Sequence, residues 1–135
     1  GKLHVYPQRN RIGFQDVILQ EEGRYEFGGP DDYQIWLGEN GYIGQEFLHG
    51  MGNNTYYTRT WPLGENAHPT TWATGQMIKQ IKRRDPEKPA FFIFHIRFPI
   101  HHWFRCQNIG ICILIRIYKN RNTEIGKTKV LFLKN

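Results

Sequence analysis

The sequence predicts an α/β fold in which a partial, mainly parallel sheet is flanked by helices. The main observation is the segment 90–98 (AFFIFHIRF), an almost continuous run of aromatic and β-branched residues. Such a run is typical of a strand that is covered on both faces. An amphipathic helical pattern comes directly before it, and a helix that leads into a buried strand is half of a βαβ unit.

The longer helix is predicted over residues 71–84. Ala73, Met77 and Ile81 recur every four residues, so their side chains line one face of a helix. Pro86 ends the pattern, because the residue before a proline avoids the helical conformation. We expect this helix to pack on the strand that follows it.

A shorter helix is predicted after a pair of aspartates, Asp31 and Asp32. Tyr33, Trp36 and Leu37 follow with the i, i+3, i+4 spacing of one helical face. We interpret the aspartates as helix-capping groups, since an aspartate oxygen can accept the free N–H groups of a first turn. An acid–base pair is the alternative interpretation.

The remaining patterns are weaker. Residues 1–6 (GKLHVY) read as a strand that ends at Pro7, and residues 41–69 read as an irregular, aromatic-lined loop of the kind that borders substrate pockets. Residues 111–118 and 130–133 have strand composition, but nothing in the sequence fixes their place in a sheet.

The charge divides the chain at about residue 103. Residues 1–103 contain eleven basic and eleven acidic residues, whereas residues 104–135 contain seven basic residues and only Glu124 as an acid. This tail is rich in Ile, Lys, Asn and Arg, and we hypothesise that it is a frameshifted or otherwise non-native ending. A basic tail that binds nucleic acid or anionic lipid is the alternative.

Composition narrows the classes of protein further. No apolar run approaches the ~20 residues that a membrane-spanning helix needs. We expect neither a membrane nor a nucleic acid as partner of this chain. Cys106 and Cys112 are too far apart along a strand for a disulfide and give no metal framework. The chain begins at Gly1, so compartment and export stay open, as does the oligomeric state.

The order of the motifs carries more information than any single motif. GKLH at a strand end, a DDYxxWL helix, HPTTW, RRDPEKPAFFIF and a histidine pair follow one another in residues 1–103. This order resembles the central part of bacterial sulfatases, within the alkaline phosphatase superfamily. The resemblance implies that residues 1–103 are an internal segment of a sulfatase-type domain, whose intact form hydrolyses sulfate esters of small molecules or glycans.

Four residues take roles from this resemblance. Lys2 and His4 match the lysine and histidine that contact the sulfate group, and their two-residue spacing puts both on one side of a strand. His101 matches the histidine that protonates the departing alcohol oxygen, a role that suits a side-chain pKa near 6.5. His102 is its rival, because Pro99 stands one residue early and Trp103 replaces the expected second proline.

Other parts of a sulfatase site do not occur in this sequence. The motif C/S-x-P-x-R, whose Cys or Ser becomes the formylglycine nucleophile, is absent, as are the acidic residues that hold a divalent cation, usually calcium. We therefore expect no cofactor on this segment and no activity from it alone. A phosphonate or phosphate ester hydrolase of the same superfamily, and a non-catalytic basic binding module, are the alternative functions.

Overall fold

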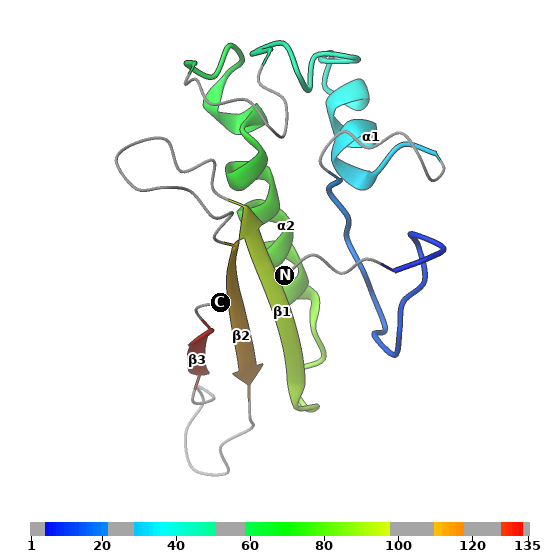
Figure 1. The fold of residues 1–135 in the computed structure, drawn as a ribbon. Coiled ribbons are helices and arrows are strands. Elements are labelled where there is room, and N and C mark those ends of the chain that lie inside the picture. The colour runs from blue at the N-terminus through cyan, green and yellow to red at the C-terminus, as the bar shows by residue number, and fades with distance from the viewer. Residues whose placement is uncertain (1–4, 22–28, 51–58, 98–109, 118–127, 134–135) are drawn as a thin grey trace. The chain divides into compact units, whose positions relative to one another are not determined.

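The computed structural model describes residues 5–21, 29–50, 59–97, 110–117 and 128–133. The chain divides into two compact units, Lys2–Trp72 and a second unit that comprises Ala73–Asn135. Along the chain (Figure 1) the elements are α1 (Asp32–Glu39), the 3₁₀ helix η2 (Glu65–Ala67), α2 (Pro69–Arg83), β1 (Ala90–Arg97), β2 (Gly110–Ile117) and β3 (Thr128–Leu133). Among the described residues, none of the helices has the length and apolarity needed to span a membrane.

Helix α1 forms the centre of the first unit. Tyr33 and Leu37 are completely or almost completely buried, with 0% and 1% of their surface exposed. The indole ring of Trp72 packs against Tyr33, with ring centroids 5.1 Å apart. The predicted shorter helix is therefore confirmed, and its two deeply buried residues belong to the apolar spacing that predicted it.

Asp31 caps α1 as the sequence predicted. Its carboxylate accepts the backbone N–H of Gln34 at 2.7 Å, and the Gln34 amide oxygen accepts the Asp31 N–H at 3.2 Å. This reciprocal pair is a capping box, which satisfies N–H groups that have no partner inside the helix. The capping interpretation is confirmed for Asp31.

Helix α2 confirms the longer predicted helix with slightly different ends. It begins at Pro69 rather than residue 71, and it ends at Arg83. Proline is well suited to the first helical position, because its missing N–H would have no partner there. After the helix, Lys88 and Asp85 form an ion pair at 3.3 Å in the turn that leads to β1.

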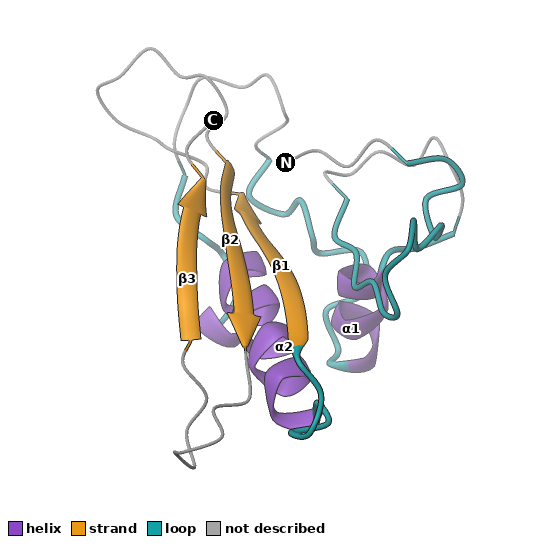
Figure 2. Cartoon of the chain, turned by 90° about the horizontal axis from the view of Figure 1, so that it is seen from below, coloured by secondary structure: helices purple, strands orange, loops and turns teal. Residues whose placement is uncertain are grey.

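The second unit contains a three-stranded sheet in the order β1-β2-β3, which Figure 2 shows together with the helices. Both pairings are antiparallel, with His95 opposite Cys112 and Cys112 opposite Leu133. Strand β1 (Ala90–Arg97) confirms the predicted strand over the described part of residues 90–98. Strand β2 takes the middle position, between β1 and β3.

The sheet differs from the sequence expectation in its partners. No parallel pairing occurs among the described strands, so the mainly parallel α/β sheet stays a prediction. The short connection favours antiparallel pairing, because residues 98–109 are about the shortest length that a crossover to a parallel strand can have. The strand-like tail segments form β2 and β3 of this sheet, and the hypothesis of a non-native tail stays a prediction.

Candidate functional site

The four residues predicted from motifs, Lys2, His4, His101 and His102, lie outside the described residues. Their expected convergence on one opening therefore stays a prediction. The described part of the chain resumes at Val5, directly after His4, and the loop that follows carries the charged pocket of the first unit.

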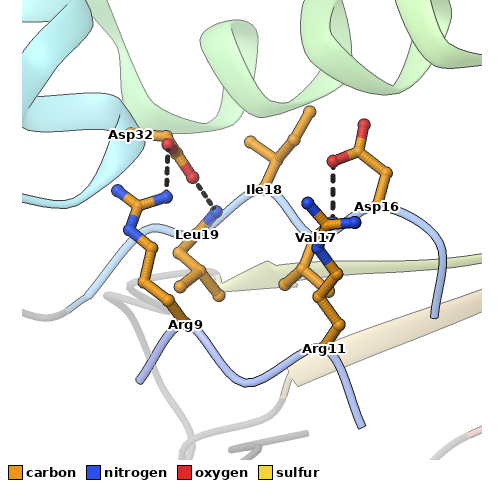
Figure 3. A pocket seen from close by; sticks show the side chains of 7 residues that line it. All are labelled: Arg9, Arg11, Asp16, Val17, Ile18, Leu19 and Asp32. Atoms are coloured by element: carbon orange, nitrogen blue, oxygen red, sulfur yellow. Dashed lines mark hydrogen bonds and ion pairs between the residues drawn. The ribbon is translucent and has the colours of Figure 1, made fainter. Parts of the chain in front are cut away.

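Two arginines of this loop face a short extended segment across a pocket of about 350 Å³ (Figure 3). In Figure 3 the guanidinium group of Arg9 extends to Asp32, and that of Arg11 extends toward Asp16 and Val17. The lining consists of Arg9, Arg11, Asp16, Val17, Ile18, Leu19 and Asp32. The pocket thus combines charged side chains with an aliphatic wall.

Arg9 and Asp32 form one fixed side of the pocket. The Nη1 atom of Arg9 lies 2.8 Å from Oδ1 of Asp32, and its Nη2 atom donates to the Pro30 carbonyl at 3.3 Å. The second oxygen of Asp32 accepts the backbone N–H of Leu19 at 2.7 Å. Asp32 therefore ties the arginine loop and the extended segment to the start of α1, and its charge is balanced by Arg9.

Arg11 is positioned by a tight turn. Its Nη1 donates to the Gln15 carbonyl at 2.9 Å, and its own carbonyl accepts the Phe14 N–H at 2.8 Å. The turn requires positive φ at Ile12 (43°) and Gly13 (94°), and glycine adopts such angles without strain. The Ile12 N–H is satisfied by the Asn10 side chain at 3.0 Å. The backbone thus holds Arg11 at the edge of the pocket.

A buried acidic pair lies behind α1. Asp31 and Glu46 are 1% and 7% exposed, and the amide of Gln34 donates to Oε2 of Glu46 at 2.7 Å. Burial raises the pKa of Glu46 to about 7, partly offset by that hydrogen bond. Burial also raises the pKa of Asp31, against the backbone N–H groups of Gln34 and Glu21 that its carboxylate accepts. A carboxyl group that titrates near neutral pH can transfer protons, but this pair is enclosed.

An aromatic cluster joins the two described ends of the loop 41–69. Trp61 lies between two imidazoles, with its centroid 5.7 Å from His49 and 5.3 Å from His68. Phe47 contacts His49 edge to face at 6.1 Å. Burial lowers the pKa of His49, which favours the neutral imidazole at pH 7. The predicted aromatic lining of this loop is confirmed, while its role at a substrate stays a prediction.

Sequence reasoning did not single out Arg9, Arg11 or Glu46. The two-residue spacing of the arginines, within a loop that follows the GKLH motif, was the available signal for the pocket. No sequence signal marks Glu46, because its burial depends on contacts with α1. No group of three or more His, Cys, Asp and Glu side chains within the described ranges could hold a metal ion, so these residues do not fit a calcium site.

Comparison with known proteins gives one informative similarity. The chain is 35% identical over 103 residues to an arylsulfatase from Clostridium perfringens (strain 13 / Type A). The aligned part is 67% of this chain and 21% of that protein, so the chain spans about a fifth of the length of this curated relative. No family model matches the sequence, and no solved structure matches it. The similarity supports a sulfatase-like relationship for the aligned part of the chain.

Proposed function

We propose that this chain is a segment of a sulfuric-ester hydrolase, in which it contributes sulfate-binding residues and a general acid. The observation that carries the proposal is the 35% identity to an arylsulfatase. The order of the motifs from GKLH to the histidine pair agrees with this assignment.

Each proposed role follows from the chemistry of the side chain. The Lys2 ammonium group is a compact cation that suits a sulfate oxygen, and the His4 imidazole offers a second hydrogen-bond donor. His101 delivers a proton to the alcohol oxygen as its bond to sulfur breaks, which removes the need to expel an alkoxide. In this proposal, the nucleophile and the acidic residues that hold the cation belong to other parts of the intact enzyme.

The leaving group provides a sharp test of these roles. The protein to use is the longest one that the coding DNA around this segment encodes, assayed with a nitrophenyl sulfate and with an alkyl sulfate. Replacing His101 by Ala removes the general acid, so kcat should fall by roughly 10²–10⁴-fold for the alkyl sulfate and much less for the nitrophenyl sulfate. Replacing Lys2 by Ala should slow both substrates by a similar factor, because the sulfate group is common to them.

The His102→Ala variant is the matched control for His101, since the two histidines are adjacent. A leaving-group effect in His102→Ala but not in His101→Ala would transfer the role to His102. Faster hydrolysis of a phosphonate ester than of either sulfate would instead identify a phosphonate or phosphate ester hydrolase of the same superfamily. If the 135-residue chain alone hydrolysed the sulfates and lost this activity on replacement of Lys2, the proposal of a dependent segment would fail.

A further inference from the structure

We propose that the pocket between Arg9, Arg11 and residues 16–19 binds the oxyanion group of a small acidic ligand, with Arg11 as its anchor. The proposal goes beyond sulfate-ester hydrolysis, since binding here requires neither a nucleophile nor a metal. Its volume of about 350 Å³ is at the lower end of ligand pockets, which run from ~300 to ~1,000 Å³, and suits a single ring with one charged group.

The two arginines differ in how many of their N–H donors remain for a ligand. The Arg9 guanidinium forms an ion pair with Asp32, and its second terminal nitrogen donates to the Pro30 carbonyl. Arg11 uses one N–H on the Gln15 carbonyl, and no ion pair joins it to a carboxylate in the described part of the chain. A guanidinium group has five N–H donors in a planar fork that matches two oxygens of a carboxylate or sulfate. Arg11 therefore retains the donors that an oxyanion needs.

The other lining residues narrow the class of ligand. Val17 and Leu19 are half-buried and offer an aliphatic wall on which one face of a ring can rest. Asp16 places a negative charge at the same pocket, and like charges repel. We expect this carboxylate to disfavour dianions such as phosphate monoesters. The preferred group is then a monoanion, a carboxylate or a sulfate ester, carried on a ring such as that of a monosaccharide.

Four matched sugars test this specificity on the 135-residue chain. Glucuronate and glucose 6-sulfate carry one negative charge, glucose 6-phosphate carries two at pH 8, and glucose carries none. Binding is followed by NMR at constant ionic strength, because screening changes all charged contacts. The two monoanions should bind at least tenfold more tightly than glucose and glucose 6-phosphate, and the backbone N–H signals of Arg11, Val17 and Leu19 should shift.

Charge-matched variants separate Arg11 from the general positive charge of the chain. Arg11→Gln should weaken binding of both monoanions at least tenfold. Arg83→Gln, an exposed arginine at the end of α2, makes the same change in net charge and should leave binding unchanged. Arg11→Lys keeps the charge without the fork, so it should bind with intermediate affinity. Equal losses in Arg11→Gln and Arg83→Gln would overturn the proposal.

If Arg11→Gln does not fold, the ligand-induced shifts of backbone N–H signals in the unaltered chain still test the proposal. Ligand-induced shifts confined to residues away from the pocket would overturn it without any variant. So would glucose binding as tightly as glucuronate, since the ring alone would then explain the affinity. Because no hydrolysis is measured, these outcomes are independent of the sulfatase proposal.

Discussion

The side chain of Gln34 connects the two buried carboxyl groups of the first unit. Its Nε2 donates to Oε2 of Glu46 at 2.7 Å, while its Oε1 accepts the backbone N–H of Asp31 at 3.2 Å. The amide can thus stabilise both groups only in one orientation, which fixes the helix cap and the position of Glu46 together. This arrangement makes the stability of the unit depend on pH.

The folded protein should lose stability as the pH rises from about 4.5 to about 7. Glu46 has a pKa of about 7 in the folded state, against an ordinary value of 4.5, so the folded state binds its proton more tightly than the unfolded state does. Below both values the carboxyl is protonated in either state, and above both it is ionised in either state. The gap between the folded and unfolded pKa values of Glu46 corresponds to a loss of about 3 kcal/mol in unfolding free energy. Urea denaturation across this pH range should measure that loss.

Glu46→Gln is the control for this pH dependence, because a glutamine keeps an acceptor for Gln34 and does not titrate. Its unfolding free energy should fall less between pH 5 and pH 7 than that of the unaltered chain. Asp31, whose pKa is raised by burial, still lowers stability as the pH rises, whereas His49 and His95, whose pKa values are lowered by burial, act in the opposite direction. The variant should therefore be more stable than the unaltered chain at pH 8. An unchanged slope in Glu46→Gln would assign the effect to another group.

Replacing Asp31 by Ala should destabilise the first unit by about 2–3 kcal/mol. The change removes a helix cap, worth ~0.5–2 kcal/mol, and leaves the Glu21 N–H without its acceptor. Asp31→Asn should cost less, because asparagine keeps one oxygen that can cap Gln34. Equal losses in both variants, measured by urea denaturation at pH 5, would show that the charge of Asp31 matters more than its capping oxygen.

The Tyr33 hydroxyl should contribute through a single buried hydrogen bond. It donates to the Ala67 carbonyl at 2.6 Å and ties α1 to η2. Tyr33→Phe keeps the packing against Trp72 and leaves the carbonyl unpaired, so we expect a loss of ~1–3 kcal/mol. Leu37→Ala, at the other buried position, should cost ~2–5 kcal/mol through the cavity it creates. A Tyr33→Phe variant as stable as the unaltered chain would mean that water replaces the hydroxyl.

The two predicted helices and the predicted strand at residues 90–98 agree with α1, α2 and β1 in the described part of the chain. Asp31 and Tyr33 could be assigned from a cap and an i, i+3, i+4 spacing, since both signals act within one helical turn. The sheet order could not be predicted, because β-pairing depends on which distant segment supplies the partner. β1 has the composition of a central strand, yet it pairs on one side only among the described strands.

The candidate pocket also depends on contacts between distant residues, which local sequence patterns do not predict. Arg9 and Asp32 are 23 residues apart, and nothing in either local sequence predicts their contact at 2.8 Å. Glu46 looks like an ordinary loop glutamate until α1 covers it. The sulfate-binding and general-acid assignments came from a resemblance between motifs, which identifies residue types in order and gives no geometry.

Removing residues 104–135 should cause the truncated chain to associate through β1. The deletion takes away β2 and β3, so the N–H and C=O groups that β1 pairs with β2 become a free edge. Phe91 and Ile93 are already 53% and 37% exposed, and β1 contains no proline that would block pairing with another chain. We expect concentration-dependent association of the truncated chain in sedimentation velocity, and monomers when Ile93→Lys adds a charge to the same edge. The full chain with Ile93→Lys is the control and should sediment as the unaltered chain does.

A truncated chain that stays monomeric at every concentration would show that β1 needs no cover from the tail, as a frameshifted ending predicts. An in-frame codon match of residues 104–135 to other proteins, combined with association of the truncated chain, would instead establish the tail as a native part of the sheet.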